Sequence, residues 1–497
     1  MPTASKSSGA GRQAAIRRPV AIDLFSGAGG LSLGLEQAGF DVLAAVEYDP
    51  VHAATHEFNF PRTEVLCADL SAPLTAKRLL SAAKQGFLAH GYDPSQWSEE
   101  LDLVAGGPPC QGFSSIGKRL IDDARNQLVF HFFRLIAELR PRYFIMENVP
   151  GIAKGGHVNI LKQLISEFER VGYLFPQKEK YRVLNAADFG VPQERYRLFL
   201  IGTRNDQAVI ARAPEPSVQA VPKRYIPQKE RVRSDLPSGP TVWDAIGDLP
   251  NPSRFPSLFT SDEVLLSRRA VEAMESTASS YARLLRCLDR EDSDLSYPRR
   301  WNSALLTGSL RTVHTDKSIR RFRLTKPGDT EPISRFYRLD PKGLCNTLRA
   351  GSGSERGAFT SPRPLHPFLP RVLSNREAAR LHSFPDWFRL HATKWHGFRQ
   401  IGNAVAPLVG RAVGREVVEA LNLAPISPEQ TLRLGETHLL ELTMQGAAAH
   451  FGVDNDAIPP PRVREIHRRA HIPNKSDKRS SSRTKAKKSH KRTAAAY

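Results

Sequence analysis

The sequence predicts an α/β protein built on a parallel sheet, with a second, smaller domain inserted before the chain returns to the first. Short apolar runs alternate with helical patterns as far as about residue 205, which is typical of a parallel sheet covered on both faces. A glycine-rich turn follows the first run. At 497 residues the chain is also too long for one ordinary hydrophobic core. These observations together predict two domains.

The expected strands follow one another at regular intervals. Apolar runs cover residues 19–25, 42–49, 101–107 and 142–149, and two further runs lie within 180–204. Apolar residues at helical spacing follow the first run, and a second helical pattern covers 127–139. The runs end in small or polar residues. Because ligands bind beyond the carboxyl ends of parallel strands, we expect the functional residues there.

The composition changes along the chain and marks the domain boundaries. Proline, arginine and irregular apolar runs replace the strand–helix alternation after residue 205, and a helical pattern returns near residue 401. We therefore predict a first domain at 18–205 that is completed by 396–425, and a smaller domain at 206–395. The rest is predicted as an N-terminal tail at 1–17, a C-terminal extension at 426–460 and a disordered tail at 461–497.

Positive charge is the main compositional feature. The formal net charge is +20, and residues 461–497 hold thirteen Lys/Arg against two acids, which indicates a polyanionic partner. Residues 299–349 carry twelve Lys/Arg against four acids. No apolar run approaches the ~20 residues of a membrane span, and the polar N-terminus is not a secretory signal. It is expected to be a frayed tail, with a transit peptide as the alternative.

Four scattered cysteines argue against a disulfide framework and a zinc site, because no C-x-x-C spacing occurs. Cys110 stands apart from the other three. It lies in GGPPCQGFS, where two prolines fix the backbone before it and a Gly/Ser-rich loop follows. A lone cysteine is usually a buried structural residue, but such a residue does not need this setting. The pattern favours a reactive thiol at the end of a strand.

The glycine turn and the acids after it predict a site for an adenosine ligand. Phe25–Gly30 (FSGAGG) lets the backbone approach a ligand at the start of a helix. Glu47 ends the next strand about 20 residues later, where a carboxylate can bind ribose hydroxyls. Asp69 follows the third strand, close to the expected adenine. The spacing alone leaves both NAD and S-adenosylmethionine open.

Several motifs occur in an order that resembles the cytosine-5 DNA methyltransferases. They are DLFSGAGGLSLGLEQAG, VEYD, GGPPCQGFS, MENVPG, QERYRLFLIG, REAARLHSFPD and RQIGNAVAP. The resemblance covers about residues 18–205 and 338–420. It implies a Rossmann-like S-adenosylmethionine-dependent methyltransferase sheet with a smaller DNA target-recognition domain. The implied activity is methyl transfer from S-adenosylmethionine to carbon 5 of cytosine, without a metal.

The resemblance also assigns the catalytic residues. Cys110 is expected to attack carbon 6 of the base, which makes carbon 5 nucleophilic. Glu147 is expected to bond the ring nitrogen N3 and the exocyclic amine. Of Arg195 and Arg197, which alternate along a strand, one is expected to contact the base and the other to hold Glu147 or the loop; the sequence does not say which. No residue is an obvious base for the carbon 5 proton.

The cofactor residues follow from the same motifs. Phe25 is expected to stack on adenine, the backbone at Gly27 and Gly29 to meet the methionine part, and Glu47 to bind the ribose. The remaining cofactor contacts are expected from Tyr48 and Asp69 at the adenine, and from Asn403 and Val405 at the methionine end.

Double-stranded DNA is the expected partner. The resemblance implies that the base leaves the duplex, that the loop after Cys110 (Ser114, Ser115, Lys118 and Arg119) closes over the backbone, and that the basic region after residue 205 reads bases. We expect a monomer on DNA, in the cytoplasm with the nucleoid. The expected role is in a restriction-modification system or as an orphan modification enzyme, and the recognition sequence and the existence of a partner restriction endonuclease stay open. Two alternatives stay open, a tRNA cytosine methyltransferase and an inactive DNA-binding module. The ~130 residues between the motifs are far more than a compact RNA enzyme needs, so they favour DNA as the substrate. The intact motifs favour an active enzyme over an inactive module.

Overall fold

The computed structural model describes residues 17–70, 76–109, 127–224, 226, 234–351 and 363–454. All of these belong to one compact unit, Met1–Pro460, and a second unit is Pro461–Tyr497. The predicted basic tail at 461–497 lies outside the described residues, as does the predicted N-terminal tail apart from Arg17. None of the described helices is long and apolar enough to cross a membrane.

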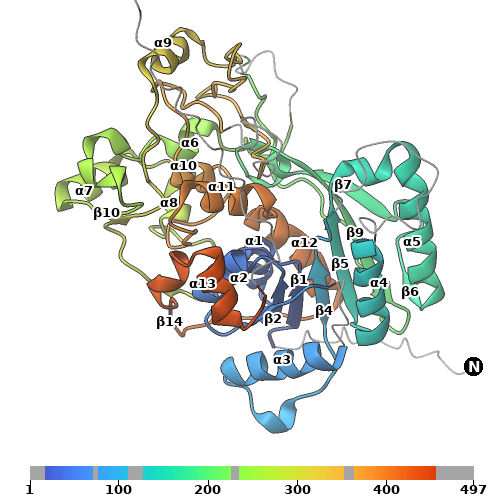
Figure 1. The fold of residues 1–497 in the computed structure, drawn as a ribbon. Coiled ribbons are helices and arrows are strands. Elements are labelled where there is room, and N and C mark those ends of the chain that lie inside the picture. The colour runs from blue at the N-terminus through green and yellow to red at the C-terminus, as the bar shows by residue number, and fades with distance from the viewer. Residues whose placement is uncertain are drawn as a thin grey trace, which may run out of the picture. The chain divides into compact units, whose positions relative to one another are not determined.

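A central sheet organises the first part of the chain (Figure 1). Within the described residues it has eight strands in the order β3-β2-β1-β4-β5-β9-β6, with β7 also paired to β9. The strands are β1 Val20–Leu24, β2 Asp41–Glu47, β3 Glu64–Cys67, β4 Leu103–Gly106, β5 Tyr143–Asn148, β6 Tyr173–Leu174, β7 Tyr181–Asn185 and β9 Tyr196–Arg204. The α/β fold predicted from the sequence is confirmed.

The expectation of a wholly parallel sheet is wrong in one respect. β1 to β5 pair in parallel, but β9 runs antiparallel to each of its neighbours β5, β6 and β7. The reason is the length of the link before it. Residues 186–195 separate β7 from β9, which is too short for the dozen or more residues of a parallel crossover. The chain therefore turns back on itself.

Helices cover both faces of the sheet, as alternation along the strands requires. On one face, Ile22, Val104 and Phe144 pack with α3 (Ala76–Ala89), α4 (Gln127–Leu139) and α5 (Val158–Arg170). On the other face, the adjacent residues Ala21, Ala105 and Ile145 pack with α1 (Gly30–Ala38) and α12 (Pro407–Ala420). Helix α2 (Pro50–Asn59) links β2 to β3. The return of the C-terminal sequence to this core explains the helical pattern after residue 401.

Short elements make up the region between β9 and α12, and two more strands, β8 before β9 and β14 after α12, pair with strands of that region. They are α6 Val242–Ile246, α7 Arg268–Thr277, α8 Ser280–Leu285, α9 Asp316–Leu324, α10 Asn375–Arg380 and α11 Lys394–Asn403, with the strand pairs β10 Val264–Leu265 and β12 Leu305–Leu306, β11 Arg299–Arg300 and β14 Leu432–Arg433, and β13 Cys345–Asn346 and β8 Gln193–Glu194. Helix α13 (Met444–Phe451) follows them. Residues of α6, α8, β13, α10 and α11 share one apolar cluster, which includes Leu33 of α1 and Phe60. The boundaries of a separate domain stay a prediction.

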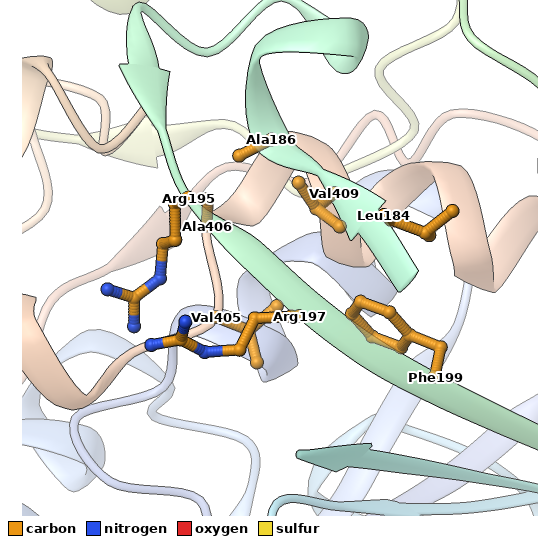
Figure 2. Close-up of a pocket in the computed structure, with 8 residues that line it drawn as sticks. All are labelled: Leu184, Ala186, Arg195, Arg197, Phe199, Val405, Ala406 and Val409. Atoms are coloured by element: carbon orange, nitrogen blue, oxygen red, sulfur yellow. The ribbon is translucent and has the colours of Figure 1, made fainter. Parts of the chain in front are cut away.

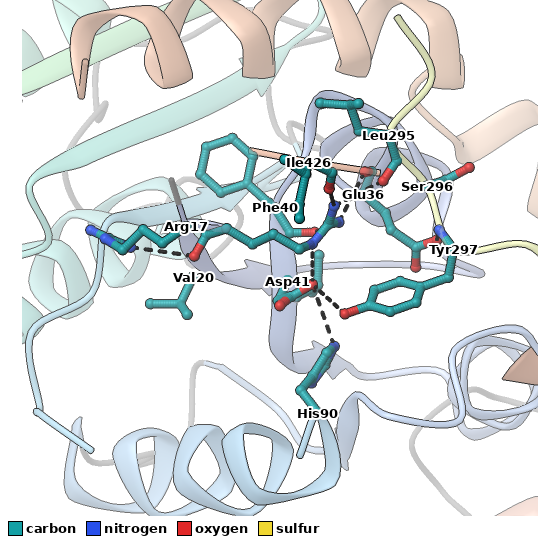
Figure 3. Close-up of polar contacts among 12 residues, drawn as sticks. Arg17, Val20, Glu36, Phe40, Asp41, His90, Leu295, Ser296, Tyr297 and Ile426 are labelled. Atoms are coloured by element: carbon teal, nitrogen blue, oxygen red, sulfur yellow. Dashed lines mark hydrogen bonds and ion pairs between the residues drawn. The ribbon is translucent and has the colours of Figure 1, made fainter. Parts of the chain in front are cut away.

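A buried polar cluster lies where β2 begins (Figure 3). The Arg18 Nε donates to Asp41 Oδ1 at 2.7 Å, and these side chains are 9% and 1% exposed. The other Arg18 N–H groups donate to the backbone carbonyl oxygens of Phe40, Leu295 and Ile426. The Tyr297 hydroxyl also donates to Asp41, at 3.0 Å. We call Arg18, Asp41 and Tyr297 the amino-end cluster; it ties three distant segments to the sheet.

Candidate active site

The glycine turn after β1 has the geometry of a close backbone approach. Phe25, Gly27 and Gly29 all have positive φ, of 58°, 57° and 101°. A Cβ on Gly29 would lie 2.3 Å from the Phe60 ring, whereas one on Gly27 would meet nothing within 4 Å. Gly29 is therefore required for packing, and Gly27 leaves open space in front of the turn for a ligand.

Glu47 fixes this turn to the next strand. Its Oε2 accepts from the Gly27 N–H at 2.8 Å, and its Oε1 accepts from the Asp49 N–H at 2.9 Å. Burial raises the pKa of Glu47 above its ordinary value, since few charges are near enough to compensate. A carboxylate has about four lone-pair sites, so Glu47 retains acceptor capacity after these two bonds.

The other predicted cofactor residues surround the same end of the sheet. Tyr48 is 42% exposed, and Asp69 follows β3, in which Cys67 pairs with Glu47 in register. Asn403 is exposed at the end of α11. The carbonyl of Val405 lies so close to the turn that a Cβ on Gly30 would be 2.4 Å from it. The structure thus brings the N-terminal turn and the C-terminal link between α11 and α12 together.

Cys110 and the loop residues Ser114, Ser115, Lys118 and Arg119 lie outside the described residues. The segment that leads to Cys110 is described. The Pro108 carbonyl accepts from the Asn148 Nδ2 at 3.1 Å, and Asn148 is 3% exposed. A Cβ on Gly107 would lie 3.0 Å from Glu147 Oε2. The start of the cysteine loop therefore lies against the end of β5, beside Glu147.

Glu147 and Arg197 form an ion pair at this position. Arg197 Nε lies 2.8 Å from Glu147 Oε1, and the side chains are 17% and 13% exposed. Burial raises the pKa of Glu147, and the charges of Arg197 and then Arg195 partly offset this rise. The carboxyl is therefore held in place, partly accessible, and easier to protonate than an ordinary glutamate.

Arg195 has different surroundings, although both arginines lie on one side of the strand (Figure 2). It is 2% exposed, and its guanidinium donates to the carbonyl oxygens of Leu348, Gly402 and Ala404 at 2.8–2.9 Å. The cavity beside the two arginines, between β9 and α12, measures about 10 Å³, which is enough for one water at most. Arg195 therefore joins chain segments, and Arg197 is the arginine at the accessible carboxyl.

Two further polar residues complete this junction, and the sequence analysis gave them no role. The Gln193 side chain donates to the Leu381 carbonyl at 3.1 Å and accepts from the Leu348 N–H at 3.0 Å. It also lies 2.8 Å from His382 Nδ1, while His382 Nε2 lies 3.0 Å from the Ala404 carbonyl. Burial lowers the pKa of His382 well below its ordinary value. Gln193 lies in the QERYR motif and His382 in the LHSFPD motif. Their place in these motifs is the feature of the sequence that could have marked them as functional.

Comparison with known proteins identifies the family. The sequence profile of the C-5 cytosine-specific DNA methylases matches residues 20–419. The chain belongs to this family. It is a DNA (cytosine-5) methyltransferase, and the family's reaction implies S-adenosylmethionine as the methyl donor.

Similar proteins support this identification. The methylase is 48% identical to the type II methyltransferase M.XorII of Xanthomonas oryzae pv. oryzae, over 89% of this chain and 94% of that protein. It is 32% identical to the type II methyltransferase M.AgeI of Thalassovita gelatinovora, over 81% and 99%. An Escherichia coli crystal structure described as a prophage-encoded DNA modification methyltransferase matches with a TM-score of 0.59 and 32% identity, over 81% of this chain and 99% of that one.

Proposed function

We propose that this methylase modifies a specific cytosine in duplex DNA by covalent catalysis from Cys110, as the modification enzyme of a type II restriction-modification system. The observation that carries the mechanism is the Glu147–Arg197 pair at 2.8 Å beside the segment that leads to Cys110. The type II names of the relatives above support the proposed restriction-modification system. The location with the nucleoid, and the monomeric state on DNA, stay predictions.

The thiolate of Cys110 forms a bond to carbon 6 of the cytosine, and the electron pair of the 5,6 double bond moves toward carbon 5 and the ring. Glu147 supports this step at N3, because a carboxyl with a raised pKa is a better proton donor as negative charge develops there. Arg197 holds one carboxyl oxygen, which leaves the other to face the base. Carbon 5 takes the methyl group and then gives its proton to a water molecule that serves as the base. The electron pair of the broken C–H bond restores the 5,6 double bond as the thiolate leaves carbon 6.

S-adenosylmethionine supplies an electrophilic methyl group when it is bound. The residues at the glycine turn fit such a ligand: Gly27 leaves open space, Glu47 has acceptor sites left for ribose hydroxyls, and the exposed Tyr48 offers a ring for adenine. Phe25, Gly29 and Asp69 complete the set on the N-terminal side. Asn403 and Val405 would close the methionine end.

The cytosine must leave the duplex, because its carbon 6 is stacked between neighbouring bases. Region 206–395 is the proposed target-recognition domain, and the tail at 461–497 is proposed to add affinity without reading bases, because it is basic and has too few apolar residues to form a core.

Cys110→Ser tests the mechanism. We expect methyl transfer to fall by at least roughly 10³-fold, since a serine alkoxide is scarcely populated near neutral pH, while DNA affinity is unchanged. Cys287→Ser, at an exposed cysteine, is the matched control and should keep full activity. Wild-type protein should also form a covalent adduct with DNA that carries 5-fluorocytosine, because fluorine cannot leave as a cation. Methylation without any adduct would contradict the thiol mechanism.

A further inference from the structure

Two cationic side chains from distant parts of the chain, Arg363 and Lys394, converge at the start of α11 on the segment that holds Arg311 and Thr312. The Lys394 Nζ donates to the Arg311 carbonyl, and the Arg363 Nη1 donates to the Thr312 Oγ1 at 3.4 Å. The Arg311 guanidinium stacks on the Phe259 ring, 3.7 Å from its centroid. We call Arg363 and Lys394 the cation cluster. Both of its members thus reach the 311–312 segment, Lys394 at its backbone and Arg363 at a side chain.

The cation cluster has no counter-ion in the part of the chain that the structure describes: neither of its two members has a carboxylate within 4.0 Å there. Neighbouring arginines differ, since Arg371 pairs with Glu377 at 2.7 Å and Arg389 pairs with Glu263 at 2.6 Å.

The charges of the cation cluster also disfavour one another. Burial and then the Arg363 charge lower the pKa of Lys394, and burial lowers the pKa of Arg363. The pKa of the adjacent His314 is lowered by burial and then by the Arg363 and Lys394 charges. Partly buried like charges without a partner are unfavourable, so a bound anion would relieve the arrangement.

Helix α11 connects the cation cluster to the active site. Lys394 begins this helix, and the Arg363 guanidinium lies 5.9 Å from the centroid of the Phe398 ring in it. At the other end, the Gly402 carbonyl accepts from Arg195. Ten residues at 1.5 Å each span about 15 Å. Because duplex DNA rises ~3.4 Å per base pair, this length corresponds to about four base pairs.

We infer that Arg363 and Lys394 bind one backbone phosphate of the substrate DNA, a few base pairs from the target cytosine. The inference rests on the proposed action on duplex DNA. Guanidinium groups match two phosphate oxygens in a fork, and the lysine adds a point charge. A duplex presents such an anion at every step of each strand. This contact sets the register of the DNA relative to the flipped base.

The test uses full-length protein and a duplex whose methylated cytosine has been mapped by bisulfite sequencing. DNA binding is measured across a salt series for wild type, for Arg363→Gln/Lys394→Gln, and for the control Lys77→Gln/Lys84→Gln. The control removes two exposed lysines of α3, a helix that packs on β2 and β3. We expect the slope of log K against log salt to fall by about 0.9 in the cluster variant and to stay unchanged in the control. kcat at saturating DNA should be unchanged in the control.

A scan with neutral methylphosphonates locates the contact without any mutation. Replacing single phosphates should weaken wild-type binding most at one position a few base pairs from the cytosine, and the cluster variant should be insensitive at that position. An unchanged salt slope, or equal sensitivity of wild type and variant at every phosphate, would overturn the inference. A protein that binds with the expected slopes but never methylates DNA would instead contradict the proposed function.

Discussion

The two ends of the strands in the sheet treat charge in opposite ways. At the amino end, the Arg18 guanidinium donates to one carboxylate and several carbonyls, and Asp41 accepts from Arg18 and Tyr297. At the carboxyl end, Glu47 and Glu147 each keep acceptor capacity beyond the bonds that hold them. Both ends are buried enough to shift pKa values. One end uses its charges to join segments, and the other keeps them available for a ligand.

The pKa directions show the same contrast. Burial raises the pKa of Asp41, but the charge of Arg18 and the hydrogen bonds around it bring the pKa below its ordinary value. The pKa values of Glu47 and Glu147 stay raised, because burial outweighs their partners. A carboxylate with a complete set of donors stabilises the fold, whereas one with an incomplete set can exchange a proton or accept a new donor.

Among the substitutions that test this contrast, Arg18→Ala should give the largest change, and this change should appear in the free energy of unfolding. It leaves Asp41 buried without its charged partner, so we expect a loss of about 3–5 kcal/mol in the free energy of unfolding, with kcat of the folded protein unchanged. The neighbouring Arg17→Ala is the matched control. Arg17 pairs with Asp102 at 2.7 Å but is 42% exposed, so its removal should change stability by under ~1 kcal/mol. Denaturant unfolding measures both, and equal losses would show that the amino-end cluster has no special role.

The pH dependence of this stability has a definite sign. The pKa of Asp41 is lowered on folding, so its contribution is present above the ordinary value of 3.8 and is lost as pH falls below it. Arg18→Ala should therefore reduce the difference in stability between neutral and strongly acidic solution, compared with wild type.

Arg197→Ala, at the carboxyl end of the sheet, should give a smaller change, and this change should appear in the activation free energy of methyl transfer. We expect kcat to fall by about 10²–10³-fold, or ~2.7–4 kcal/mol, because Glu147 loses the group that orients it during charge development. The melting temperature should hardly change. Arg182→Ala is the control: Arg182 lies on the adjacent strand β7 and pairs with the exposed Glu215 at 2.6 Å, so its loss should leave kcat unchanged. A fall in stability as large as that of Arg18→Ala would place Arg197 with the structural residues.

The sequence predicted the carboxyl end of the sheet well, because its signals are local. The helix expected at 127–139 has those bounds, and the glycine turn and Glu47 lie where strand ends were expected. The direction of β9 was missed because strand direction depends on the length of the link before it and not on periodicity. The partners of Arg195 were missed for another reason. They are carbonyls of Leu348, Gly402 and Ala404, and alternation along a strand says nothing of distant backbone.

The amino-end cluster was not predicted at all. Asp41 precedes an apolar run and Arg18 follows a polar segment, so both resemble ordinary surface residues in the sequence. Their burial depends on Leu295 and Ile426, more than 250 residues away. The cation cluster has the same origin, because only the fold brings positions 363 and 394 together. Residues that belong to a local motif can be predicted from a sequence. Residues that lie far apart in the sequence and meet only in the folded chain cannot.

Glu47→Gln should give the smallest of these effects, and it tests whether the carboxyl end of the sheet binds the ribose of the cofactor. A neutral amide keeps one acceptor oxygen but loses the charge, so we expect S-adenosylmethionine to bind about tenfold more weakly, or ~1.5 kcal/mol. Wild-type affinity should also fall as pH falls, because the ribose hydroxyls donate to the ionised carboxylate and burial raises the pKa of Glu47 above 4.5. The fall should therefore begin at a higher pH than for an ordinary glutamate, and it should be absent in Glu47→Gln. Glu64→Gln, at an exposed position that begins β3, is the control and should follow wild type. Calorimetric titration with the cofactor between pH 5 and 8 separates the variants, and an equal pH dependence in wild type and Glu47→Gln would show that this carboxylate does not face the bound ribose.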